Sequence, residues 1–155
     1  ITGSSSTAAA GSVTTLIANV IAVVTGSAGT ASLGSVTVTT NVTNYAVTVA
    51  SGTNIYGSGN KYYINGSVSP TLTLNEGDTY WFDQSDSSNS GHPLRFSTTA
   101  NGTWGGGSQY TTGVTTVGTP GSAGAYTKIT VASGAPTLHY YCTNHSGMGG
   151  QANTP

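Results

Sequence analysis

Two stretches of the sequence carry the side chains best suited to chemistry. The segment YYCTNHSGMGG, at 140–150, spaces Cys142, His145 and Met148 as C-x2-H-x2-M at the end of an apolar run. This segment contains the only cysteine and the only methionine of the chain. Far upstream, His92 opens a second apolar run, GHPLRFS. A thiolate, two imidazoles and a weakly bound thioether form the ligand set of a mononuclear copper site, so these four residues predict one metal centre.

The same residues also have interpretations without copper. A single cysteine excludes an internal disulfide, so Cys142 is a buried thiol, half of an intermolecular bridge or a metal ligand. In the absence of a metal, Met148 would fill a gap in the core and His145 would be a hydrogen-bonded turn residue. Zinc is a substitute for copper in the same ligands and brings no redox chemistry. We favour the metal centre because coincidence explains the spacing poorly.

Other residues with chemical potential give weaker signals. His139 lies three residues before Cys142, and therefore on the opposite face of a strand, so we predict that it is not a ligand. Four carboxylates match no calcium-loop spacing and are expected to cap turns. They are Glu76, Asp78, Asp83 and Asp86. Serines are abundant but no G-x-S-x-G motif accompanies them, so we predict that the protein is not an enzyme.

Composition restricts the class of protein. Charged residues make up 5% of the 155 residues, against about 25% in an average soluble protein, so Ser, Thr, Asn and Gly must provide solubility. The three Lys and Arg residues are too few to neutralise a nucleic-acid backbone, and we predict no nucleic-acid binding. The nine tyrosines and two tryptophans are capable of stacking on sugars or bases. In a small β-protein we expect them in the core or an interface instead.

Location and membrane association follow from the same composition. The longest apolar run, Leu16 to Val24, is about half of the ~18 residues that a membrane span needs, so no span is predicted. A surface rich in Ser, Thr and Asn favours an extracellular or particle-surface location over the cytosol. The chain starts at Ile1 without an initiator Met, and we interpret it as a processed product or a fragment of a larger protein.

Short strands between turn signals are expected to position the candidate ligands. Apolar residues alternate along several runs, which places one set of side chains on an inner face. The expected inner sets begin at Val47, Leu72, Tyr80, His92, Ile129 and Leu138. No run shows the 3.6-residue period of a helix, and the segments 102–108 and 118–124 are glycine-rich loops. The pattern predicts an all-β sandwich.

The chain is predicted to have two parts, an N-terminal β extension over residues 1–44 and the sandwich over residues 45–155. Within the extension, Leu16 to Val24 is rich in β-branched residues, which favours a strand over a helix. This strand is too apolar for a free surface. We expect it to pack on a protein partner, in a homo-oligomer or a larger assembly.

Residues 45–155 resemble the cupredoxin family, in particular its plastocyanin- and amicyanin-like members, through the C-x2-H-x2-M spacing and the upstream histidine. The resemblance implies a Greek-key β-sandwich with His92, Cys142 and His145 as equatorial copper ligands and Met148 as the axial ligand. One position departs from the family pattern. The residue after the first histidine commonly donates its backbone N–H to the cysteine sulfur, but Pro93 has no N–H. We therefore expect copper binding with impaired electron transfer.

A second resemblance concerns context. The segments GHPLRFS and CTNHSGMGG are similar to modules in virion structural proteins of marine bacteriophages, especially those that infect cyanobacteria. This similarity implies a structural, decoration or fibre-type module on the surface of a virion or extracellular assembly. The alternative is a soluble type 1 (blue) copper electron-transfer protein. The low number of charged residues argues against this alternative, because electron carriers are commonly steered to their partners by complementary charge.

Overall fold

The structure is a computed structural model in which residues 40–155 are described. The predicted partner-binding strand, Leu16 to Val24, lies outside the described residues, as does the predicted extension up to residue 39. The first observed strand, β1, begins at Val42. No helix in the described range is both long and apolar enough to cross a lipid bilayer.

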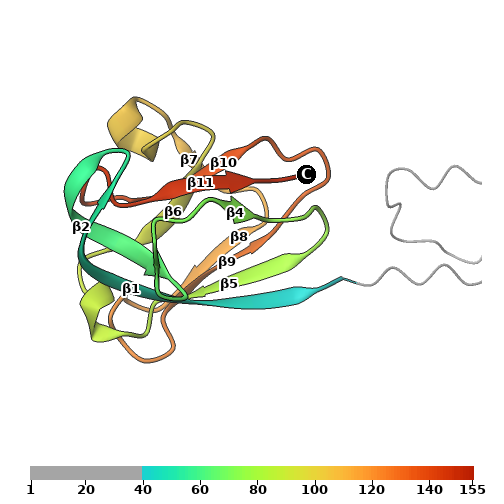
Figure 1. Cartoon of the computed structure of the whole chain (residues 1–155). Coiled ribbons are helices and arrows are strands. Elements are labelled where there is room, and N and C mark those ends of the chain that lie inside the picture. Colours follow the sequence, from blue (N-terminus) through green and yellow to red (C-terminus); the bar gives the residue numbers. More distant parts are fainter. Residues whose placement is uncertain (1–39) are drawn as a thin grey trace, which may run out of the picture. The chain divides into compact units, whose positions relative to one another are not determined.

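Two β-sheets form the domain (Figure 1). The first has the strand order β3-β2-β1-β5-β9-β8, with β1 at Val42–Asn54, β2 at Gly57–Ile64, β3 at Ser67–Val68, β5 at Thr79–Asp83, β8 at Val114–Val117 and β9 at Tyr126–Thr130. The second has the order β4-β11-β10-β6-β7, with β4 at Leu72–Thr73, β6 at Leu94–Ser97, β7 at Gln109–Tyr110, β10 at Leu138–Cys142 and β11 at Gly150–Asn153. Two 3-10 turns, η1 at Ser87–Asn89 and η2 at Gly102–Gly105, lie in the connections.

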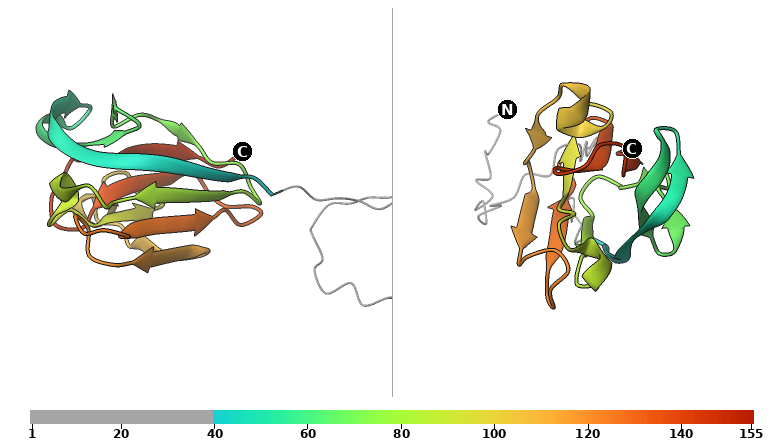
Figure 2. Two further views of the ribbon diagram at one scale, coloured as in Figure 1. Left: turned by 90° about the horizontal axis from the view of Figure 1, so that it is seen from below. Right: turned by 90° about the vertical axis from the view of Figure 1, so that its left-hand side faces the viewer.

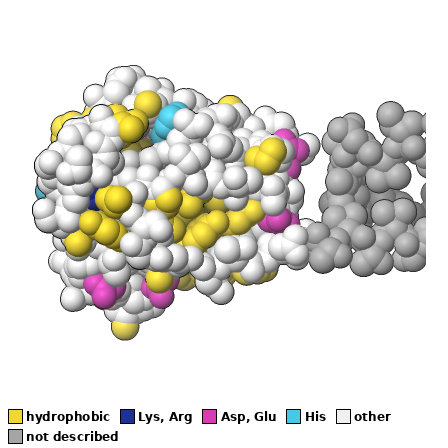
Figure 3. Space-filling view, in the orientation of Figure 1, with side chains coloured by type: hydrophobic (Ala, Val, Ile, Leu, Met, Phe, Trp, Pro, Cys, Tyr) yellow, Lys and Arg dark blue, Asp and Glu magenta, His cyan; other side chains and the backbone are white. Residues whose placement is uncertain are grey.

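The core lies between the two sheets and contains the apolar sets that alternation predicts. Along β5, Tyr80 and Phe82 are buried while Trp81 is on the other face. The same pattern holds for the other predicted inner sets, whose buried members include Val47, Leu72, Leu94, Phe96, Ile129, Leu138 and Tyr140. The prediction of an all-β sandwich is therefore confirmed. A band of hydrophobic side chains is visible on the face of the domain shown in Figure 3.

The long strand β1 connects different parts of the first sheet. Its N-terminal half pairs in parallel with β5, in a register that places Asn44 beside Trp81. Its C-terminal half forms an antiparallel hairpin with β2 that turns after Asn54. The left panel of Figure 2 shows β1, β5 and β9 side by side, in front of the second sheet.

Candidate metal centre

Three of the four predicted ligands meet in space. The candidate ligand atoms of His92, Cys142 and His145 lie within 4.8 Å of one another. The Cys142 Sγ atom is 3.9 Å from Nδ1 of His92 and 3.7 Å from Nδ1 of His145. The two imidazole rings have their centroids 4.5 Å apart and are tilted by 44° to each other. Residues fifty positions apart in the chain thus form one cluster.

These distances fit a single bound metal ion. A metal about 2.3 Å from a thiolate and about 2.05 Å from an imidazole nitrogen separates the two donor atoms by about 3.6 Å at a tetrahedral angle. At a trigonal angle of about 120°, the same bonds separate them by about 3.8 Å. The observed 3.7 and 3.9 Å are within about 0.3 Å of both values, so they fit one bound ion in either geometry. Both histidines direct the same ring nitrogen toward the sulfur, so one ion can bind all three atoms.

Strand pairing explains why the cluster forms. Cys142 is the last residue of β10 and pairs with Leu94, the first residue of β6. His92 lies two residues before β6, and therefore beside the end of β10. His145 follows in the loop between β10 and β11, which returns the chain along the same strand. The antiparallel register of two neighbouring strands is sufficient to bring these residues together.

Met148 lies in the same loop, three residues after His145, and its side chain is only 1% exposed. The backbone carbonyl of Met148 accepts hydrogen bonds from the Tyr62 amide at 2.9 Å and from the Ser69 hydroxyl at 3.0 Å. These bonds attach the end of the ligand loop to β2 and to the connection that follows β3. That the Met148 thioether is the axial ligand stays a prediction.

A buried amide fixes the backbone on both sides of Pro93. Gln84 is 1% exposed, and its Nε2 atom donates to the His92 carbonyl at 2.8 Å while its Oε1 atom accepts from the Leu94 amide at 3.1 Å. The Tyr62 hydroxyl donates a second bond, of 2.8 Å, to the His92 carbonyl. Although Pro93 has no N–H to offer, the peptide groups around it are held by side chains from the first sheet.

The β1–β2 hairpin holds the ligand loop from one side. Lys61 is buried, and its Nζ atom donates to the Gly147 carbonyl at 2.7 Å. The side-chain Nδ2 atom of Asn54 donates to the same carbonyl at 3.0 Å and to the Gly149 carbonyl at 3.2 Å. Burial lowers the pKa of Lys61, because the charged ammonium loses contact with water. The loop is therefore anchored to β1 and β2 without participation of the ligand side chains.

The η2 turn holds the loop from the other side. Asn101, at a left-handed φ of 61°, accepts a bond from the Gly147 amide at 2.7 Å and donates one to the Ser146 hydroxyl at 2.9 Å. The Trp104 indole N–H donates to the Cys142 carbonyl at 3.0 Å. With anchors on both sides, the loop has little freedom to move the side chains of His145 and Met148.

The electrostatic environment favours metal binding at neutral pH. Burial, together with the neighbouring His145, lowers the pKa of His92 and so keeps its imidazole neutral. Burial, and next the neighbouring Cys142 sulfur, raises the pKa of Tyr62 well above its usual value, so that its hydroxyl remains a donor. A neutral imidazole is the form that binds a metal ion.

Sequence reasoning missed the residues that support the cluster. Gln84 has the same parity along the strand as Tyr80 and Phe82, so the alternation carried a signal that it points inward. Lys61 gave no such signal, because its burial depends on a carbonyl from a distant loop.

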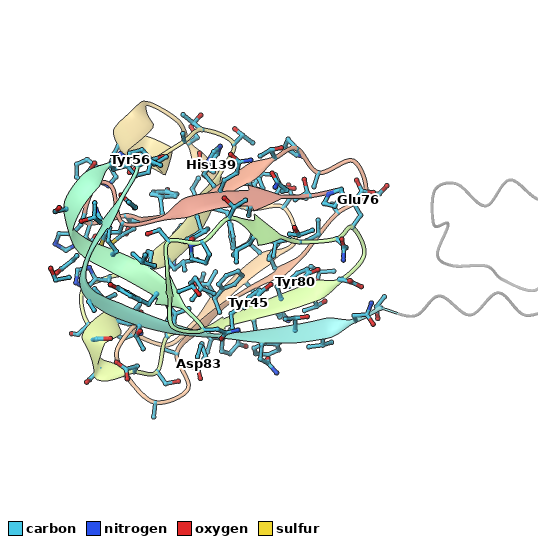
Figure 4. The ribbon with its side chains drawn as sticks, in the orientation of Figure 1. Tyr45, Tyr56, Glu76, Tyr80, Asp83 and His139 are labelled. Atoms are coloured by element: carbon cyan, nitrogen blue, oxygen red, sulfur yellow. The ribbon has the colours of Figure 1, made fainter. Side chains whose placement is uncertain are left out.

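The structure also describes the residues that were not predicted as ligands. His139 is half-buried, lies outside the His92, Cys142 and His145 cluster, and is labelled in Figure 4. All four carboxylates accept hydrogen bonds from backbone N–H groups, as expected for residues that cap turns and loops. The pairs are Glu76 with Gly134, Asp78 with Asn41, Asp83 with Ser85, and Asp86 with Ser88.

The chemistry that this arrangement can perform follows from its donor atoms. A buried thiol and two imidazoles form a soft, nitrogen- and sulfur-rich site that suits copper or zinc and not calcium or magnesium. His145 is exposed, so the cluster reaches the protein surface through this residue.

No protein-family model, curated protein or solved structure matches this chain.

Proposed function

We propose that the domain is a cupredoxin-like copper-binding module, with His92, Cys142 and His145 as equatorial ligands and Met148 as the axial ligand. The observation that supports this proposal is the pair of sulfur-to-nitrogen distances, 3.9 and 3.7 Å, around a single point. A thiolate, two imidazoles and a weakly bound thioether form the ligand set of blue-copper sites, and Met148 supplies the only thioether of the chain from the same loop as His145. When bound, copper would supply a one-electron couple.

The biological role that we propose is structural, as a decoration or fibre-type module on the surface of a virion or extracellular assembly. The metal would cross-link the β10–β11 loop to the segment before β6. An ion that binds only the folded chain stabilises it by RT ln(1 + [L]/Kd), about 4 kcal/mol at a thousandfold excess over Kd. The N-terminal segment Leu16 to Val24 would contact protein partners. The low charge of the chain supports a role in a fixed assembly.

A soluble type 1 copper electron carrier is the second candidate. The observation in its favour is the exposure of His145, which offers a route for an electron between the metal and a partner protein. Pro93 argues against it, because the N–H that commonly tunes the cysteine sulfur in cupredoxins is absent. The anchored loop suits both candidates.

The test is a titration of the full chain with Cu(II), followed by visible absorption and light scattering. We expect one copper per chain with an intense thiolate-to-copper band, lost in Cys142→Ser and retained in the control variant His139→Ala. Binding of zinc alone, without such a band for copper, would contradict the copper proposal. A freely diffusing monomer with a reversible copper couple would replace the structural role with the electron carrier.

A further inference from the structure

A hollow of about 240 Å³ lies on the outer face of the first sheet, away from the core. Its walls include Asn44 of β1, Trp81 and Asp83 of β5, and Tyr126 of β9. Figure 4 shows Asp83 on the opposite side of the β1–β5 layer from Tyr80. None of the residues that line the hollow belongs to the metal cluster, so the hollow can be tested separately from the metal centre.

Two aromatic side chains form the apolar part of the hollow. The rings of Trp81 and Tyr126 have their centroids 4.3 Å apart, at 49° to each other. Both side chains are only partly buried and neither belongs to the core cluster. Core packing therefore does not account for these aromatic groups, which present ring surface to solvent in a concave site.

Polar groups surround the aromatic pair with unused hydrogen-bonding capacity. One oxygen of Asp83 accepts bonds from Ser85, and its other oxygen has no partner within residues 40–155. In the same range, the side chains of Asn44, Trp81 and Tyr126 make no hydrogen bonds with protein groups. Each of four residues that line the hollow, Asn44, Trp81, Asp83 and Tyr126, thus carries a polar group that a ligand could bond.

The charges around the hollow restrict its ligand. The Lys128 ammonium lies 5.1 Å from the centre of the Trp81 ring, so a second cation on this ring would be repelled. The Asp83 carboxylate disfavours an anion. Such a site suits a neutral molecule with apolar C–H faces and many hydroxyl groups.

We infer that this hollow is a binding site for a neutral saccharide. The C–H face of one sugar ring would lie on Trp81 and Tyr126, and its hydroxyl groups would bond to Asp83 and Asn44. The volume of about 240 Å³ is below the roughly 300–1,000 Å³ typical of pockets for larger ligands, which fits recognition of one sugar unit at a time.

The test uses the isotope-labelled full chain and NMR titrations with four probes, the tetrasaccharides of glucose, mannose, galactose and N-acetylglucosamine. We expect at least one probe to shift the amide signals of Asn44, Trp81 and Tyr126 in a saturable manner. Trp81→Ala should weaken binding about tenfold or more, through loss of the ring surface. Asn44→Ala, on an exposed strand position, should weaken it about fivefold, through loss of one hydrogen bond.

Asn60→Ala is the matched control, because Asn60 is an exposed asparagine of β2 in the same sheet but outside the hollow. This variant should bind as the parent does. The Asn44→Ala variant keeps the test decisive even where Trp81→Ala fails to fold. Saturable shifts from none of the four probes, unchanged affinity in the hollow variants, or displacement of the sugar by tetramethylammonium would each overturn the assignment.

Discussion

The Nε2 atom of Gln84 donates a 2.8 Å hydrogen bond to the carbonyl oxygen of His92, a candidate ligand. The other end of the same amide accepts the Leu94 N–H, so one buried side chain holds the backbone before and after Pro93. Mutation of a group that orients a ligand typically lowers metal affinity about 10- to 100-fold. Gln84 is therefore a positioning residue for His92.

Replacement of this amide is expected to weaken both the fold and the site. Gln84→Leu leaves the Leu94 N–H buried without its partner, and should reduce the free energy of unfolding by about 1–3 kcal/mol. Copper affinity should fall about tenfold, because His92 loses one of its backbone anchors. Urea denaturation and competition with a copper chelator measure the two effects. Gln109→Leu, at an exposed position of β7, is the control, and equal copper affinities of the two variants would exclude a positioning role.

The Lys61 ammonium should affect the ligand loop more than it affects the core. Lys61→Met keeps most of the apolar stem of the side chain but removes the bond to the Gly147 carbonyl, which retains only the side-chain amide of Asn54 as donor. We expect faster hydrogen exchange of the loop amides and a severalfold loss of copper affinity. Lys128→Met is the matched control, since Lys128 lies on the outer face of β9. Unchanged exchange in Lys61→Met would show that the loop does not depend on this anchor.

A bound metal should stabilise the domain through Cys142. At a thousandfold excess of copper over Kd, the gain of about 4 kcal/mol corresponds to an increase in Tm of roughly 10 °C. Cys142→Ser should lose this increase, and His139→Ala should keep it. Scanning calorimetry with and without copper measures both. If Cys142→Ser retained the copper-dependent increase, the metal would be bound elsewhere.

The Asp78 carboxylate gives the domain a defined response to acid. The backbone N–H of Asn41 donates a 2.8 Å hydrogen bond to the Asp78 carboxylate, and this bond holds the pKa of Asp78 below its usual value. Because the folded-state pKa is the lower one, this contribution to stability is complete above the unfolded-state pKa of about 3.9 and is lost as the pH falls through the folded-state pKa. Asp78→Asn should therefore be less stable than the parent at pH 7, and the difference should shrink toward pH 2. Urea denaturation at both pH values tests this, and a constant difference would contradict it.

Alternation predicted the fold class, and the short C-x2-H spacing predicted that Cys142 and His145 share one site. Both features are local, since a two-residue period fixes which side chains face the core. The meeting of His92 with these two residues, fifty positions downstream, was predicted from strand parity and from the resemblance to cupredoxins. The loop anchors were not predictable in the same way. The bond from Lys61 to Gly147 joins residues 86 positions apart, and β2 and the ligand loop belong to different sheets, so only the packing of the two sheets brings them together.

The hollow on the outer face shows a second limit of sequence reasoning. Alternation predicted that Trp81 faces away from Tyr80 and Phe82, and the structure agrees. Its neighbours were not predictable, because β1 pairs with β5 in parallel and β9 pairs with β5 from the other side. Such long-range pairings, which no single run of residues encodes, place Asn44 and Tyr126 around the Trp81 ring.

X-ray absorption at the copper edge of the loaded full chain tests the shared metal centre most directly. We expect one short copper–sulfur bond together with two imidazole nitrogen donors, and loss of the sulfur contribution in Cys142→Ser. A coordination shell of nitrogen and oxygen atoms alone, unchanged by this substitution, would contradict the shared metal centre.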